Sequence, residues 1–266
     1  MIISFTTSPT RIHKCKPMLD SLLKQTIKPE LILLNIPQVF RRTEETYDIP
    51  EFVSDVVTIN RADQDYGPAT KIIPTVKYLN EHHYSDDTRI IYLDDDIHYK
   101  DKMIETIENL ADNKNIYTAT GFDIINNRIT GIRQNLVNAA IAEGYGGVCV
   151  TLDTFGSDFE EYINKYTLSN LDFYLSDDMV LSNYYHKRGK KIKIINQMGK
   201  YSVFDMWNNK NILDYGNLTD ALHNGADGIS HNNVNRYSKV TQGFELENER
   251  YYPINNYRSH TMSTLK

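Results

Sequence analysis

Cysteine is scarce in this 266-residue sequence, which contains only Cys15 and Cys149. The first lies in a loop-like segment and the second in an apolar one, which is not the pattern of a disulfide-stabilised scaffold. This scarcity is typical of proteins in the reducing cytosol, and we therefore expect a cytoplasmic location.

Long hydrophobic runs are also missing. The longest ones, 31–34 and 90–93, fall far short of the roughly 20 apolar residues that a transmembrane helix needs. The sequence starts without a basic segment and a long apolar stretch, so we expect no signal peptide. Hydrophobic residues still make up 40% of the chain and charged residues 24%, which is enough to build a folded core.

The sequence has no excess of basic residues. Lys and Arg total 29 against 35 Asp and Glu, which gives a net charge of -6. A protein that coats duplex nucleic acid needs a basic surface, so we expect no nucleic-acid partner. One positive pocket for a small phosphorylated ligand remains compatible with this charge.

Apolar residues follow strand and helix periodicities in alternation, without an internal repeat or a long linker. The strands expected from this pattern are 2–6, 31–36, 56–60, 89–93, 116–120, 121–125, 148–152 and 191–195. The expected helices are 16–25, 69–79, 101–110, 158–165, 178–188 and 232–244. The alternation predicts one α/β domain over residues 1–245, with a mostly parallel central sheet and helices on both faces, and then a polar tail over 246–266.

Three carboxylates, Asp94, Asp95 and Asp96, directly follow the apolar strand predicted over 89–93. Ligands of open α/β sheets bind at the carboxyl ends of strands, and carboxylate oxygens suit Mg²⁺ or Mn²⁺ shared with substrate phosphates. In an extended chain Asp94 and Asp96 would face the same way and Asp95 the other way. The alternative is a solvated acidic loop, but the position after a fully apolar strand favours a metal site.

A second group of polar residues, 61–71, follows the strand predicted over 56–60 and should occupy the same edge of the sheet. Thr70 and Lys71 fall in the first turn of the predicted helix 69–79, where backbone N–H groups favour an anion. A lysine there would contact a phosphate as a point charge. An ordinary turn with a surface lysine explains the same residues equally well.

Two further segments carry polar side chains at element boundaries. Thr6 ends the first predicted strand and Arg11 lies in the loop after it, and this loop suits either nucleotide contacts or an N-cap cluster. Asp177 and Asp178 begin a predicted helix, where carboxylates commonly act as caps; the functional alternative is that one caps and the other is a positioned base.

Two late histidines, His223 and His231, flank a glycine-containing segment, 224–228. A lone histidine is more often structural than a metal ligand. Near a carboxylate site, however, a neutral imidazole can complete the coordination of a metal.

The order of these motifs resembles the GT-A-fold glycosyltransferases that carry a DxD motif. The resemblance covers roughly residues 1–245. Within that family, the sequence is most similar in character to the small stand-alone enzymes of large DNA viruses and of bacterial polysaccharide clusters. It rests on the loop 6–11, the Asp-Tyr-Gly-Pro-Ala-Thr-Lys segment 65–71, the triplet 94–96, the Gly-Tyr-Gly-Gly loop 144–147 and the Asp-Asp helix start 177–178.

The resemblance implies a GT-A-like domain that uses Mn²⁺ or Mg²⁺ and a nucleotide-sugar donor, usually UDP-linked. The acceptor would be a glycan, glycolipid or glycoprotein, and the enzyme a hexosyltransferase. Asp96 would be the principal metal ligand, Asp94 would hold the metal or the ribose, and Asp95 completes the donor-binding motif. His223 would be the C-terminal metal ligand, and His231 is the second candidate for this role.

The resemblance also implies roles for the remaining residues. Thr6, Arg11 and Asp65 would contact the nucleoside, and Lys71 the diphosphate. The loop 144–147 would shape the sugar and acceptor pocket. Asp178 would be the general base of an inverting transfer, with Asp177 as the second candidate, because Asp177 stands where the family motif has Glu.

Two other functions share some of these features. Phosphohydrolases of the haloacid-dehalogenase type also place Asp-x-Asp after an apolar strand and bind Mg²⁺. Their motif normally ends the first strand and is followed closely by Thr or Val, whereas here it ends about the fourth predicted strand and Ile97 follows. A catalytically degenerate nucleotide-sugar-binding protein is the third possibility, and the intact carboxylates argue against it.

Overall fold

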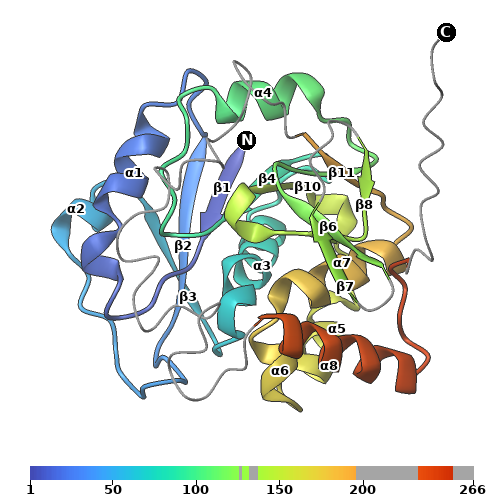
Figure 1. The fold of residues 1–266 in the computed structure, drawn as a ribbon. Coiled ribbons are helices and arrows are strands. Elements are labelled where there is room, and N and C mark those ends of the chain that lie inside the picture. The colour runs from blue at the N-terminus through green and yellow to red at the C-terminus, as the bar shows by residue number, and fades with distance from the viewer. Residues whose placement is uncertain (126–127, 132–136, 196–232, 254–266) are drawn as a thin grey trace, which may run out of the picture.

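The computed structural model describes residues 1–125, 128–131, 137–195 and 233–253. Within these residues, a central sheet of eight strands has the order β3-β2-β1-β4-β10-β5-β11-β8 (Figure 1). Its strands are β1 (Ile2–Phe5), β2 (Leu31–Pro37), β3 (Thr58–Ala62), β4 (Arg89–Leu93), β5 (Ile116–Thr118), β8 (Asn138–Ala139), β10 (Val148–Thr151) and β11 (Ile192–Ile194). A smaller antiparallel sheet in the order β7-β6-β9 consists of β6 (Gly121–Ile125), β7 (Arg128–Gly131) and β9 (Ile141–Ala142).

Most strands of the central sheet run in the same direction. β1 pairs in parallel with β2 and β4, β2 pairs in parallel with β3, and β11 pairs in parallel with β5. β10 runs against both β4 and β5, and β8 runs against β11. The predicted α/β class with a mostly parallel sheet is therefore confirmed.

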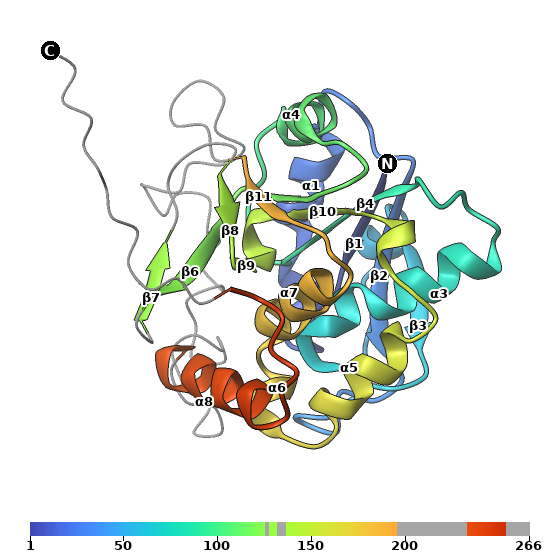
Figure 2. The same ribbon diagram turned by 90° about the vertical axis from the view of Figure 1, so that its right-hand side faces the viewer.

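Helices cover both faces of this sheet, as predicted. One face packs against α1 (Lys16–Leu23), α2 (Glu51–Ser54) and α4 (Met103–Leu110). The other packs against α3 (Ile73–Glu81), α5 (Phe159–Thr167), α6 (Leu171–Tyr174), α7 (Asp177–Lys187) and α8 (Asn233–Leu246), and Figure 2 shows α7 close to the sheet with α8 farther out. None of the helices in the described parts of the chain is both long and apolar enough to cross a membrane.

The alternation of side chains along β4 explains why this strand is apolar throughout. Ile90 and Tyr92 belong to the core beneath α3 and α7, whereas Ile91 and Leu93 belong to the core beneath α1 and α4. A strand covered by helices on both sides must supply apolar residues at every position.

The reversed direction of β10 was not predicted, and the chain path explains it. The short turn η3 (Gly144–Gly146) lies at the edge where β4 ends, and β10 begins two residues later with Val148 paired to Tyr92. A parallel pairing would have required the chain to return first to the opposite edge of the sheet, where β4 begins. The chain instead re-enters the sheet directly and runs antiparallel to β4.

The predicted helix 69–79 is divided in the structure. A 3-10 turn, η2 (Gly67–Lys71), comes first, and α3 begins only at Ile73. Pro74 falls within the first two positions of α3, where its missing N–H leaves no helix hydrogen bond unmade. Lys71 therefore ends a 3-10 turn and does not lie in the first turn of an α-helix.

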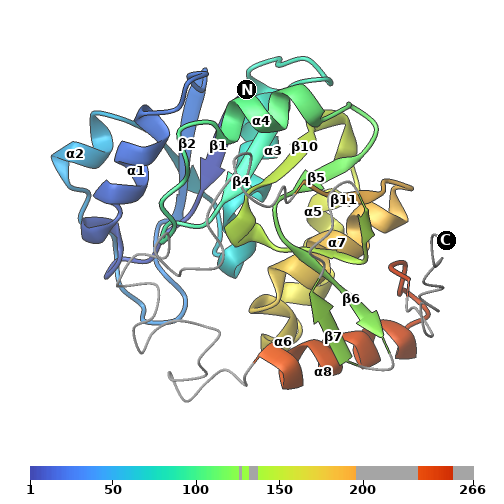
Figure 3. The same cartoon turned by 45° about the horizontal axis from the view of Figure 1, so that its top comes forward.

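Helix α8 joins the small sheet to the rest of the domain, as Figure 3 shows. The ring of Tyr237 on α8 stacks on Phe122 of β6, with 5.5 Å between ring centroids. After α8 the chain returns to α7, where the backbone N–H of Tyr251 donates to Asn183 Oδ1 at 2.7 Å and Tyr252 is buried. The boundary between domain and tail that was placed at residue 245 stays a prediction.

Candidate functional site

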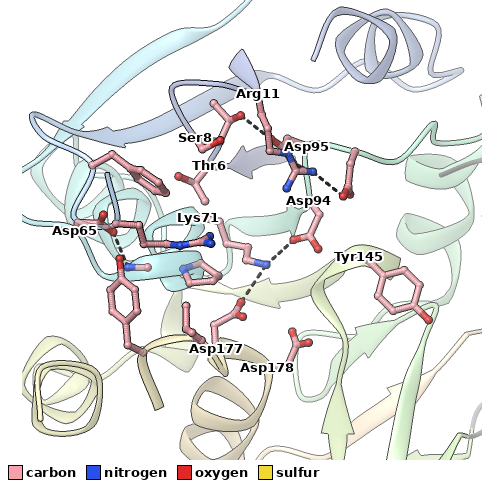
Figure 4. Close-up of a pocket in the computed structure, with 18 of the residues that line it drawn as sticks. Thr6, Ser8, Arg11, Asp65, Lys71, Asp94, Asp95, Tyr145, Asp177 and Asp178 are labelled. Carbon is pink, nitrogen blue, oxygen red and sulfur yellow. Dashed lines mark hydrogen bonds and ion pairs between the residues drawn. The ribbon is translucent and has the colours of Figure 1, made fainter. Parts of the chain in front are cut away.

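Four neighbouring parallel strands, β3, β2, β1 and β4, end at the same edge of the central sheet and lead into polar loops. The chain order reverses between β1 and β4, which is the topological switch point where open α/β sheets bind ligands. A cavity of about 390 Å³ lies at this edge (Figure 4). Its lining includes every predicted site residue in the described part of the chain: Thr6, Arg11, Asp65, Lys71, Asp94, Asp95, Asp96, Asp177 and Asp178.

Arg11 crosses the switch point and pairs with two carboxylates of the triplet. Its Nη2 lies 2.8 Å from Asp95 Oδ1 and 2.6 Å from Asp96 Oδ2. The Thr7 hydroxyl donates to the other oxygen of Asp95 at 2.5 Å. Burial raises the pKa of Asp95 to about 6, with Arg11 opposing the shift and Asp96 adding to it.

These contacts differ from the expected geometry of an extended triplet. The strand β4 ends at Leu93, and a turn follows in which one guanidinium reaches both Asp95 and Asp96. The expectation that Asp95 would point away from its neighbours' site is therefore wrong, because the chain does not stay extended. Arg11, for its part, is engaged by carboxylates, so its predicted contact with a nucleoside stays a prediction.

Another cation of the cavity, Lys71, lies between two carboxylates from distant parts of the chain (Figure 4). Its Nζ is 2.6 Å from Asp94 Oδ1 and 3.0 Å from Asp177 Oδ2. Although burial disfavours the charged ammonium, Asp177, Asp94 and Asp178 hold the pKa of Lys71 well above its usual value. A contact with donor phosphates would require this ammonium to leave or share its two carboxylates.

The pair at the start of α7 faces the cavity. Asp177 pairs with Lys71, and Asp178 Oδ1 accepts a hydrogen bond from the backbone N–H of Gly144 at 2.9 Å. Both contacts go to other elements, which favours the functional interpretation over a simple helix cap. Burial and the neighbouring Asp177 raise the pKa of Asp178 well above its usual value, with Lys71 opposing the shift.

Asp65 lines the cavity, and its carboxylate binds backbone groups. Its two oxygens accept hydrogen bonds from the N–H of Arg41 at 2.8 Å and the N–H of Gly67 at 2.7 Å. Gly67 has a φ of +65°, and a Cβ there would lie 2.7 Å from the carbonyl oxygen of Tyr174. Asp65 thus fixes the loop after β2 to a turn that needs glycine, and its expected nucleoside contact stays a prediction.

The donor set fits a hard divalent cation. Among the described residues, no three His, Cys, Asp or Glu side chains are grouped as a metal site. Mg²⁺, however, usually takes one or two carboxylates together with substrate phosphates. Asp94 and Asp96 each use one oxygen in an ion pair, and the second oxygen of each is of the type that Mg²⁺ or Mn²⁺ binds. The predicted metal ligand His223 and its alternative His231 lie outside the described residues.

Several lining residues were not predicted as site residues. They include Phe40, Arg42, Tyr47, Glu143, Tyr174, Arg236 and Tyr237. Tyr145, from the glycine-rich loop 144–147, also lines the cavity, and Glu143 directly precedes this loop, which was therefore a usable signal for Glu143. Burial raises the pKa of Glu143 to about 7. Arg236 and Tyr237 come from α8, far along the chain, and no local pattern marks them.

Comparison with known proteins gives no family assignment. No protein-family model matches the chain, and no curated protein matches it significantly. Among the solved structures that match is the crystal structure of the galactosyltransferase LgtC in complex with donor and acceptor sugar analogues. It is 13% identical in sequence, the match covers 74% of this chain and 73% of that chain, and the TM-score is 0.42. These values support no statement about activity, which has to be argued from the chemistry of the site.

Proposed function

We propose that this protein is a GT-A-like glycosyltransferase of the hexosyltransferase class. It moves a sugar from a nucleotide-sugar donor, UDP-linked, to a hydroxyl group of a glycan, glycolipid or glycoprotein. The observation that carries the proposal is the set of residues that line the cavity at the switch point. It combines a carboxylate triplet suited to a divalent cation with a separate carboxylate, Asp178, that is suited to accept a proton.

The donor side of the cavity is assigned to the edge between β1 and β4. Asp94 and Asp96 would hold Mn²⁺ or Mg²⁺, and a bound cation would neutralise the charge that develops on the diphosphate leaving group. Arg11 holds Asp95 and Asp96 in place through its two ion pairs. Thr6 and Asp65, which line the same cavity, are assigned to the nucleoside.

The acceptor side is assigned to Asp178. The oxygen of an acceptor hydroxyl attacks the anomeric carbon, its proton passes to Asp178, and the bond from that carbon to the diphosphate breaks with both electrons leaving on the diphosphate. The N–H of Gly144 orients the carboxylate. A raised pKa makes Asp178 a stronger base than an exposed aspartate. Attack opposite the leaving group inverts the anomeric centre.

A panel of nucleotide sugars tests the proposal. Thermal unfolding is measured with each compound, with and without Mn²⁺, because a ligand at about 100 times its Kd adds roughly 2.7 kcal/mol to stability. We expect one UDP-sugar to raise the Tm most, only in the presence of Mn²⁺, and to release UDP when glycan acceptors are added. Absence of stabilisation by every nucleotide sugar would contradict the proposal.

Two further results separate the alternatives, one from an assay on phosphate esters and one from the nucleotide-sugar panel. Release of inorganic phosphate from phosphate esters would indicate a phosphohydrolase, although the triplet follows β4 and not the first strand. Binding of a nucleotide sugar without turnover on any acceptor would indicate a binding protein.

A further inference from the structure

Lys71 is enclosed on several sides within the cavity wall. Only 3% of its side chain is exposed, and its ammonium lies 2.6 Å from Asp94 and 3.0 Å from Asp177. The Tyr92 ring is 5.9 Å from the ammonium, and the Tyr92 hydroxyl accepts a hydrogen bond from Tyr185 at 3.0 Å. The ammonium thus has an aromatic ring on one side and, on the others, the carboxylate that follows β4 and a carboxylate of α7.

The remaining side of this enclosure is a glycine. A Cβ at Gly144 would lie 2.6 Å from Lys71 Nζ and 3.4 Å from the nearest oxygens of both Asp94 and Asp178. Gly144 itself is not part of the cavity lining, although its neighbours Glu143 and Tyr145 are. The missing side chain therefore makes room for the ammonium.

The backbone of Lys71 is held as firmly as its side chain. Its carbonyl oxygen accepts hydrogen bonds from the Ser4 hydroxyl and, at 3.3 Å, from Asn35 Nδ2. Asn35 also donates to the hydroxyls of Ser4 and Thr75, at 2.9 Å and 2.8 Å. Because all of these groups are buried, the network fixes the point from which the side chain of Lys71 extends.

We propose that Lys71 is a positioning residue that joins the carboxylate of Asp94 to that of Asp177 and does not itself bind the donor's phosphates. The inference rests on the proposed function, because it assigns Asp94 to the cation and the α7 pair to the acceptor. Lys71 holds the two half-sites at a fixed separation and offsets the repulsion between their carboxylates. This role replaces the phosphate contact expected from the sequence.

A stability measurement tests the bridge without any ligand. Lys71→Met leaves two carboxylates unpaired and should lower the Tm by about 10 °C. The double variant Lys71→Met/Asp177→Asn removes one of those charges and should recover about half of the loss. Lys77→Met is the matched control, because Lys77 pairs with Glu160 on the surface and its loss should shift the Tm by under about 2 °C. A double variant no more stable than Lys71→Met would overturn the bridge.

A binding measurement separates positioning from phosphate contact. Gly144→Ala keeps the charge of Lys71 but displaces its ammonium, and Gly131→Ala is the control, because a Cβ at Gly131 meets nothing within 4 Å. UDP affinity is measured in Mn²⁺ and in EDTA. We expect Gly144→Ala to weaken binding in Mn²⁺ by about 10-fold to 100-fold, as loss of a group that orients metal ligands does, and to leave binding in EDTA within about twofold.

Two results would contradict the positioning role. An equal loss of UDP affinity in Mn²⁺ and in EDTA would show that the ammonium contacts the phosphates directly. Unchanged affinity in both conditions would show that Lys71 serves stability alone. If the wild-type protein binds no UDP at all, the proposed function fails, while the Tm comparison still decides whether Lys71 bridges the two carboxylates.

Discussion

The backbone N–H of Gly144 donates a hydrogen bond to Asp178 Oδ1 at 2.9 Å, which links the turn before β10 to the first turn of α7. This contact uses one oxygen of Asp178 and fixes the direction of the other. Asp177, the neighbouring carboxylate, is paired with Lys71 at 3.0 Å. The two aspartates therefore differ in what they offer a substrate, although they are neighbours in the sequence.

Asp178→Asn should lower the rate of sugar transfer by roughly 10²-fold to 10⁴-fold, which is the usual contribution of a general base. The amide oxygen of Asn can still accept from Gly144, so the fold should persist. UDP affinity should barely change, since the base acts on the acceptor. The measurement is UDP release from the donor that the nucleotide-sugar panel identifies, with acceptor present.

Asp177→Asn is the companion variant. It should lower stability, because it leaves Lys71 with one carboxylate partner, but it should retain more activity than Asp178→Asn. If Asp177→Asn is inactive and Asp178→Asn is active, the general base is Asp177. Wild-type rates in both variants would remove the support for an inverting mechanism.

Arg11→Met should destabilise the protein by about 3 kcal/mol, because it leaves the buried Asp95 and its neighbour Asp96 without their cation. Urea denaturation measures the loss. Lys16→Met is the control, since Lys16 and Asp20 form an exposed pair whose removal should cost under about 0.5 kcal/mol. Equal effects of the two variants would show that Arg11 is not needed to hold the triplet.

Glu143 should make stability depend on pH. Its pKa is raised from 4.5 to about 7 by burial, so between these values the folded chain holds a proton that the unfolded chain has released. Stability therefore falls as pH rises through this window. The Glu143→Gln side chain cannot titrate. Its free energy of unfolding, compared with that of wild type at the same pH, should therefore rise by about 2 kcal/mol between about pH 4 and about pH 8. This figure is smaller than the full pKa shift would give, because the side chain is only half-buried. A pH-independent difference would contradict the assigned pKa.

The two thiols should be unreactive in the folded protein. Cys15 and Cys149 are free and buried, and burial raises the pKa of each to about 12. Because the thiolate is the reactive form, a thiol reagent should label neither cysteine in buffer and both in denaturant. Rapid labelling of one thiol under native conditions would contradict the described packing.

The sequence predicted the parts of this structure that depend on local pattern. The apolar run 89–93 is β4 as expected, and the segments that follow β1, β3 and β4 meet in one cavity because parallel strands end at the same edge. What local pattern cannot show is pairing across the fold. Nothing in the sequence joins Arg11 to Asp96, which meet because β1 and β4 are neighbours in the sheet. Nothing joins Lys71 to Asp177 either, which meet because α7 packs against η2.

Cavity residues from distant elements were not predicted for the same reason. Arg236 and Tyr237 reach the cavity because α8 packs beside α6 and β6, and their sequence surroundings are those of an ordinary helix. The direction of β10 depends on a turn of a few residues, and a strand's apolar pattern carries no information about its direction.

The most direct test of the proposed function is the effect of Mn²⁺ on UDP binding in wild type and in Asp96→Asn. The substitution keeps the size of the side chain and an oxygen that Arg11 can contact, and it removes the charge that would hold the cation. Asp63→Asn is the control, because Asp63 is 86% exposed and does not line the cavity. We predict that Mn²⁺ strengthens UDP binding to wild type and to Asp63→Asn. In Asp96→Asn, the factor by which Mn²⁺ increases UDP affinity should be at least about tenfold smaller. An Asp96→Asn protein that shows the full Mn²⁺-dependent enhancement would contradict a cation site at the triplet.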